Sequence, residues 1–152
     1  MALRRFVFDT NIYRYMASHP GYASQIWEDD HPMSASAVVL SELWRSARRE
    51  KPQELLKAWE KHFRKFVFAP SCEDWRQVGQ YLSTLLPSDG RRVAPQLLHT
   101  LRKEQNDALI ALSSWNRGFA VVTCDNDFER IHAWARAPEW KLVRIPAPAT
   151  PP

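Results

Sequence analysis

Phe-Ala-Val-Val-Thr-Cys-Asp-Asn-Asp-Phe, residues 119–128, is the stretch that decides the fold. Its first half is short, continuous and apolar, which is typical of a strand covered on both faces in a parallel sheet. The strand ends in Thr123 and is followed at once by Cys124 and Asp125. Residues 3–8 form a similar apolar run, apart from two arginines, and lead directly into Asp9. Because ligands bind at the carboxyl ends of parallel strands, this pattern predicts that both aspartates lie in one crevice.

The rest of the chain alternates between helical and strand patterns. Apolar spacing predicts helices over 22–28, 36–49 (with Ser36 as N-cap), 52–63, 71–86, 93–117 and 127–135, and short strands over 33–35, 66–68 and 141–145. The longest of these helices could break near residues 105–106. Strands separated by helices favour an α/β sandwich built around a parallel sheet.

Length and composition indicate one soluble folded domain. The chain has 152 residues, of which 45% are hydrophobic and 25% charged. We expect a single domain over residues 1–145 and an extended Pro-rich tail over 146–152. Cys72 and Cys124 have no metal-binding or redox spacing, and no export signal or membrane-spanning segment is expected, so we predict a cytoplasmic protein with reduced cysteines. The net charge of +4 suits a polyanionic partner without requiring one.

Acidic residues stand beside apolar segments at four places: Asp9, Glu42, Asp107 and Asp125. Residues 108–112, which follow Asp107, are apolar around nearly the whole helix circumference, so this helix is expected to be buried. Buried acids are usually paired or coordinate a metal ion. Clustered carboxylates without a neighbouring cation repel one another, and a hard divalent ion such as Mg²⁺ resolves that conflict. Such sites hydrolyse phosphate esters by activating water, so the pattern indicates nuclease chemistry.

Four segments, in this order, resemble the sequence motifs of PIN-domain ribonucleases, particularly the VapC toxins of bacterial toxin-antitoxin pairs. They are Asp9-Thr10-Asn11, Ser41-Glu42-Leu43, Asn106-Asp107-Ala108-Leu109-Ile110-Ala111 and Thr123-Cys124-Asp125-Asn126-Asp127-Phe128. Each motif alone is weak, but the four together cover almost the whole chain. The resemblance implies a three-layer α/β/α sandwich with a central, mostly parallel sheet of four to five strands.

The same resemblance implies an endoribonuclease that depends on Mg²⁺ or Mn²⁺. Its catalytic and metal-binding acids would be Asp9, Glu42, Asp107 and Asp125. Thr10, Asn11 and Thr123 match polar motif positions that would orient acids or waters. The fourth acid could also be Asp127; we prefer Asp125 because it comes directly off the strand end, whereas Asp127 suits a helix cap.

The family resemblance also implies the substrate and the partners. The substrate would be a structured cellular RNA of the transfer or ribosomal class, cut to leave a 5′-phosphate and a 3′-hydroxyl. A cognate antitoxin would cover the acidic crevice, and an arginine is a sensible group to occupy a carboxylate cluster. The chain would also form a homodimer. Residues 88–105 look long and basic enough to hold a family-specific loop.

Each acid also has a simpler interpretation. Asp9 could only cap the next helix, Glu42 could be solvated, and Asp107 could be an acid in the first turn of its helix. Asp125 could shape an Asx turn. Basic residues near Glu42 and Asp107 are usually solvated, although they could bind RNA phosphates.

Two other functions remain open at this stage. A phosphatase of the haloacid dehalogenase type also begins with a strand followed by aspartate, but it needs a second acid where this chain has Asn11. A PIN-like module that binds RNA or protein without catalysis would usually lack one or more of the four acids. Metal binding at these acids distinguishes such a module from a nuclease.

Overall fold

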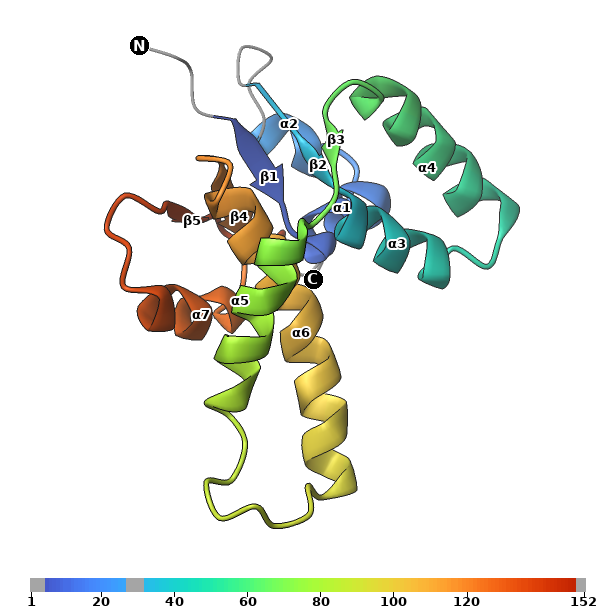
Figure 1. The fold of residues 1–152 in the computed structure, drawn as a ribbon. Helices are drawn as coiled ribbons and strands as arrows, with labels where there is room; N and C mark the ends of the chain where they lie inside the picture. Colours follow the sequence, from blue (N-terminus) through green and yellow to red (C-terminus); the bar gives the residue numbers. More distant parts are fainter. Residues whose placement is uncertain (1–4, 27–31, 150–152) are drawn as a thin grey trace.

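The computed structural model describes residues 5–26 and 32–149 (Figure 1). The elements are β1 (Phe6–Phe8), α1 (Thr10–Ser18), α2 (Tyr22–Ile26), β2 (Ala35–Ser36), α3 (Ala37–Ser46), α4 (Glu50–Phe63), β3 (Val67–Phe68), α5 (Cys72–Ser83), α6 (Pro95–Trp115), β4 (Ala120–Thr123), α7 (Asp127–Ala135) and β5 (Leu142–Arg144). Residues 3–4 of a predicted strand, 27–28 of a predicted helix and 150–152 of the predicted tail lie outside the described residues. No helix in residues 5–26 and 32–149 is long and apolar enough to cross a membrane.

All strand pairs of the described chain are parallel, as predicted. The strands β1, β4 and β5 form one ladder in the order β1-β4-β5, and β2 pairs with β3. A single bridge between Phe6 and Met33 joins the two ladders, so the spatial order is β3-β2-β1-β4-β5. The chain therefore winds outward in both directions from the neighbouring strands β1 and β4. In doubly wound sheets, ligands bind where the strand order reverses in this way.

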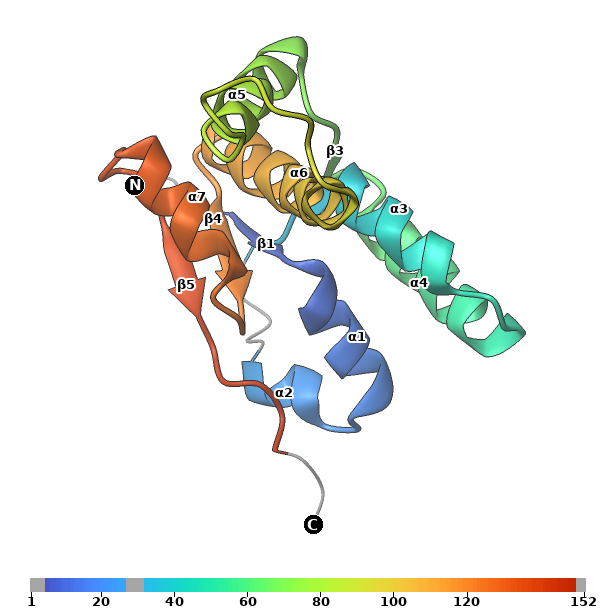
Figure 2. The same ribbon diagram turned by 90° about the horizontal axis from the view of Figure 1, so that it is seen from below.

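Helices cover both faces of the three-stranded sheet, which confirms the predicted sandwich (Figure 2). On one face, α5, α6 and α7 pack against one another: the ring of Tyr81 meets that of Trp134, and Glu104 pairs with Arg130 at 3.1 Å. On the other face lie α1 and α2. Every residue of β4 is buried, which explains why its sequence is continuously apolar up to Thr123.

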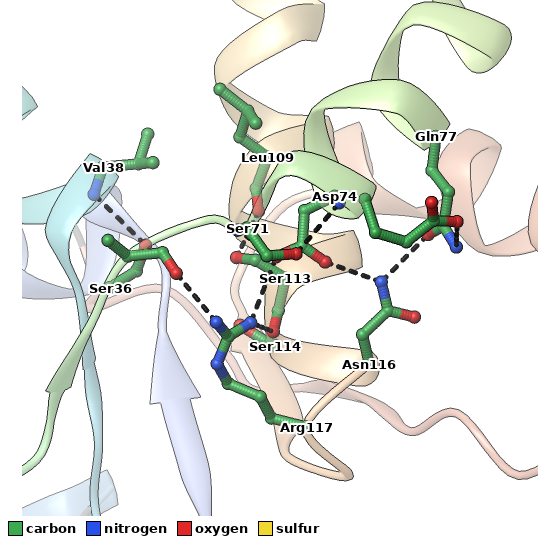
Figure 3. A network of polar contacts seen from close by, with 12 residues as sticks. Ser36, Val38, Ser71, Asp74, Gln77, Leu109, Ser113, Ser114, Asn116 and Arg117 are labelled. Atoms are coloured by element: carbon green, nitrogen blue, oxygen red, sulfur yellow. Dashed lines mark hydrogen bonds and ion pairs between the residues drawn. The ribbon is translucent and has the colours of Figure 1, made fainter.

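A polar network joins the start of α5 to the end of α6 (Figure 3). Ser71 and Asp74 form a reciprocal capping box at the N-terminus of α5. The buried Asp74 carboxylate also accepts hydrogen bonds from Asn116 at 2.6 Å and Arg117 at 3.2 Å. Burial alone would raise the pKa of Asp74, but these donors together hold it below the ordinary value. The network fixes the end of α6 immediately before β4, the strand that leads to Asp125.

The main correction concerns the longest helix, because α6 runs unbroken from Pro95 to Trp115. Residues 105–106 do not interrupt it, and Asp107 lies in its middle rather than in a first turn, so the helix-dipole interpretation of this acid is wrong. Of residues 88–105, only those before Pro95 lie in a loop. In addition, α3 ends at Ser46, before the predicted residue 49.

Candidate acidic active site

The sheet edge at the β1–β4 switch point opens into a crevice of about 440 Å³. Five carboxylates line it: Asp9, Glu42, Asp107, Asp125 and Asp127. They come from the end of β1, from α3, from the middle of α6, from the turn after β4 and from the first residue of α7. The structure therefore brings together all four acids predicted from the sequence, together with the alternative Asp127.

Asp9 caps α1 and faces the crevice at the same time. One carboxylate oxygen, Oδ1, accepts from the backbone N–H groups of Asn11 at 2.6 Å and Ile12 at 3.2 Å. The other, Oδ2, accepts from the hydroxyl of Thr123 on the neighbouring strand. The N-cap interpretation of Asp9 is therefore correct but incomplete. Each carboxylate oxygen can accept more than one hydrogen bond, so capping leaves room for a further ligand.

Glu42 is held by two neutral side chains from other elements. Thr10 on α1 donates its hydroxyl to Oε2, and Asn106 on α6 donates its amide to Oε1 at 2.7 Å. Glu42 is partly buried, and Arg45, one helical turn away, approaches it only to 4.0 Å. The interpretation of Glu42 as a freely solvated helical residue does not fit these contacts.

Asp125 and Asp127 differ in their partners. Asp125 accepts from the amide of Asn11 at 2.8 Å and lies 3.2 Å from the hydroxyl of Thr123. It also accepts from the backbone N–H of Asp127 at 3.1 Å, which is the Asx turn expected of this segment. Asp127 instead forms an ion pair with Lys103 on α6, with 2.6 Å between nitrogen and oxygen. Among the described residues, Asp127 has a cation as its partner, whereas Asp125 has only neutral donors.

Asp107 is partly buried in the crevice wall, and no group in the described chain donates a hydrogen bond to its carboxylate. Burial, helped by the negative charge of Asp127, raises the pKa of Asp107 to about 8, although Lys103 opposes the shift. Burial likewise raises the pKa of Asp9 to about 6, against the hydrogen bond from Thr123. Both acids thus hold protons more strongly than exposed aspartates do. Raised pKa values of this kind, in which burial is the main cause and neighbouring acids add to it, are typical of functional sites.

The donor set of the crevice fits a hard divalent cation. All the acidic ligands are carboxylate oxygens, which Mg²⁺ and Mn²⁺ prefer. Within residues 5–26 and 32–149, no three histidine, cysteine, aspartate or glutamate side chains form a ready ligand set for one ion. Mg²⁺ suits such a site because it keeps several waters and binds through only one or two carboxylates directly.

Asn106, Lys103 and Arg14 are among the crevice residues to which sequence reasoning gave no individual role. Asn106 belongs to the quoted motif around Asp107, and its contact with Glu42 shows why an amide precedes that acid. The i to i+4 spacing from Lys103 to Asp107 was a readable signal that both lie on one helix face. Of the predicted supporting residues, Thr10, Asn11 and Thr123 each donate to a different acid of the cluster.

Comparison with known families and structures gives one family match. The family model described as PIN domain matches residues 6–133 of the chain. This range includes every acid of the crevice and ends within α7. A search of curated proteins gave no significant match.

Several solved structures share the fold. VapBC2 from Rickettsia felis, bound to a DNA fragment from its promoter, aligns with a TM-score of 0.59 and 21% identity over 93% of this chain and 98% of that one. VapBC-1 from nontypeable Haemophilus influenzae aligns with a TM-score of 0.61 and 16% identity over 92% of this chain and 97% of that one. FitAcB from Neisseria gonorrhoeae aligns with a TM-score of 0.55 and 15% identity over 91% of this chain and 96% of that one. At these identities the similarity establishes the architecture alone.

Proposed function

Because the chain belongs to the PIN domain family, whose members are generally nucleases, we propose that it is a divalent-metal-dependent endoribonuclease. The observation that carries the proposal is the cluster of buried and partly buried acids, which repel one another, at the β1–β4 switch point. Such a cluster destabilises the fold unless a cation joins it, so its presence favours a role in binding a metal.

Each acid of the cluster has a distinct position in this proposal. Asp107, which receives no hydrogen bond from the described chain, is the best placed to bind the ion directly. Asp9, Glu42 and Asp125 are held by Thr123, by Thr10 with Asn106, and by Asn11, respectively. These neutral donors fix the carboxylates without adding positive charge, so they leave the site attractive to a cation.

The bound ion would supply an activated water and neutralise charge on the phosphate during hydrolysis of the phosphodiester. Asp9, Glu42, Asp107 and Asp125 would hold the ion, and their carboxylates line the crevice that a phosphate would enter. We propose a structured RNA of the transfer or ribosomal class as substrate, with 5′-phosphate and 3′-hydroxyl products.

We also propose that the protein is the toxin of a VapBC-type pair, acting in the cytoplasm as a homodimer. The support is the shared fold with structures described as VapBC complexes, together with the order of the four motifs. A cognate antitoxin would cover the crevice, and an arginine side chain from it would neutralise the acids in place of a metal ion.

The test is cleavage of purified transfer and ribosomal RNA by the protein free of any partner. We expect discrete cuts with Mg²⁺ or Mn²⁺, none with chelator, and none from Asp107→Asn under any condition. Metal binding without cleavage of any RNA in the panel would contradict the substrate class. Absence of metal binding at these acids would contradict the nuclease and favour a module that binds RNA or protein without catalysis.

The two acids after β4 should differ in their effect on cleavage. Asp125→Asn should lower the rate by about 100-fold, because it removes a charge that only neutral donors compensate. Asp127→Asn should lower it less than about tenfold, since Lys103 already neutralises that carboxylate. The measurement is the initial rate of RNA cleavage at saturating Mg²⁺. Glu129→Gln, which removes an exposed acid of α7 that pairs with Arg144 of β5, is the control. Equal losses, or a larger loss at Asp127, would make Asp127 the fourth acid.

A further inference from the structure

Exposed basic side chains surround the buried and partly buried acids of the crevice. The basic residues that line it are Arg14 of α1, Arg45 of α3, and His99, Arg102 and Lys103 of α6. All five are exposed, whereas none of the lining acids is. The crevice therefore has negative charge at its base and positive charge at its rim.

Two of these arginines are not neutralised by the acids beside them. Lys103 pairs with Asp127 at 2.6 Å, and Arg45 lies 4.0 Å from Glu42. Within the described chain, Arg14 and Arg102 form no ion pair; Arg14 makes only a long contact of 3.5 Å with the side-chain oxygen of Asn11. Two guanidinium groups thus stand next to several carboxylates without binding any of them, which leaves both free for an external anion.

The register of α6 continues this cationic rim away from the acids. His99, Arg102 and Lys103, Asn106 and Asp107 follow one another at spacings of three and four residues, so they share one helix face. From His99 to Asp107 this face spans about 12 Å, given a rise of about 1.5 Å per residue. The N-terminal half of α6 projects beyond the sheet together with α5 (Figure 1). Each strand of a DNA double helix places a phosphate about every 3.4 Å along the helix axis, so a face of this length is comparable to several phosphate steps of a nucleic-acid strand.

We propose that Arg14 and Arg102 bind RNA backbone phosphates next to the one that is cleaved, with the His99–Asp107 face of α6 guiding the strand into the crevice. This inference rests on the proposed ribonuclease function. Guanidinium groups suit this role because they stay charged and donate two parallel hydrogen bonds to phosphate oxygens. Without such cations the acids would repel the substrate. The contacts are to the backbone, so they supply affinity independent of sequence.

The first test measures binding without cleavage. Fluorescein-labelled bulk transfer RNA is titrated with the full chain in chelator, at several NaCl concentrations, and binding is followed by fluorescence anisotropy. We expect Arg14→Gln/Arg102→Gln to weaken binding by about tenfold or more. The plot of log affinity against log salt should become less steep by about 1.5, since each phosphate contact contributes about 0.7 to 0.9 to its steepness. Both side chains are exposed, so thermal unfolding should be unchanged.

Arg49→Gln/Arg64→Gln is the matched control, because it removes the same charge from exposed residues flanking α4 that do not line the crevice. If the crevice variant binds RNA like this control, the proposal is wrong. Poly-glutamate provides a further comparison. If the crevice variant loses poly-glutamate binding but keeps RNA binding, the arginines serve an acidic protein, and the proposal is again overturned.

A second measurement separates this inference from the proposed function. With Mg²⁺ present, we expect the crevice variant to cleave RNA with a raised KM and a kcat close to wild type. Wild-type cleavage with an unchanged KM in the variant would refute the phosphate-binding role and leave the nuclease intact. RNA binding that depends on both arginines, without cleavage by the wild type, would support the phosphate-binding role and refute the nuclease.

Discussion

Asp9→Asn should lower RNA cleavage by about a thousandfold and leave the stability of the fold nearly unchanged. Asparagine caps helices about as well as aspartate, so its side-chain oxygen can still accept from the N–H groups of Asn11 and Ile12. What the substitution removes is the negative charge at the β1–β4 switch point. Stabilisation of the transition state by a metal ion is worth several kcal/mol, and about 4 kcal/mol corresponds to a thousandfold in rate.

Initial rates of RNA cleavage and the midpoint of thermal unfolding together check this result. Asp9→Ala is the comparison, because it loses the cap as well as the charge and should cost about 1 kcal/mol of stability in addition to the activity. Asp89→Asn, which removes an exposed acid paired with Arg91 outside the crevice, should change neither quantity. A variant with asparagine at position 9 that cleaves at more than about a tenth of the wild-type rate would leave capping as the only role of Asp9.

Local sequence patterns predicted the strands and helices whose surroundings are uniformly apolar. β4 is buried along its whole length, so its residue types alone identified it, and α7 has the predicted bounds because Asp127 begins it after a clear strand and turn. The alternation of strands and helices was enough to place Asp9 and Asp125 at one edge of a parallel sheet. This inference required only the general rule for such sheets.

Local patterns were misleading at α6 because polar and charged residues that line the crevice interrupt its apolar face. Lys103, Asn106 and Asp107 line the crevice, so the apolar periodicity is interrupted where the helix itself is not. The polar stretch at residues 105–106 therefore resembled a helix break. Sequence-level reasoning is expected to fail at such positions, where a site breaks the rules that otherwise specify the fold.

The contacts that hold the acids in place could not be predicted from spacing. Asn106 and Glu42 are 64 residues apart, and Asn11 and Asp125 are 114 residues apart. Only the tertiary structure shows which neutral donor orients which carboxylate. The family resemblance supplied the residue types at these positions, and the structure supplied their pairing.

Without metal, the protein should become less stable as the pH rises from about 4 to about 8, and Asp107→Asn should remove much of this loss. The folded pKa of Asp107 is about 8, because burial and the charge of Asp127 favour its protonated form, whereas an unfolded aspartate titrates near pH 4. Between these values the folded chain retains a proton that the unfolded chain has released, so the free energy of unfolding falls with pH. Each pKa unit corresponds to about 1.4 kcal/mol, which gives a total effect on the order of a few kcal/mol.

The environment of Asp107 fixes the sign of this effect. The charged groups that act on it are Lys103 of the same helix, Glu42 of α3, and Asp125 and Asp127 from the segment after β4. Three of the four are acids, so the carboxylate ion has more repulsion than attraction in the crevice. A divalent cation reverses that balance, and metal binding should therefore release protons and stabilise the fold most strongly at high pH.

Thermal unfolding between pH 5 and pH 8.5, with chelator or with Mg²⁺, measures both effects. At pH 8 in chelator, Asp107→Asn should unfold at a higher temperature than the wild type, and Mg²⁺ should raise the midpoint of the wild type but not that of the variant. Asp89→Asn should follow the wild type at every pH. A variant less stable than wild type across the whole range would mean that Asp107 contributes favourable contacts as an ion. In that case the acid cluster would be a structural feature. The repulsion between its carboxylates would then no longer support binding of the metal that the proposed reaction needs.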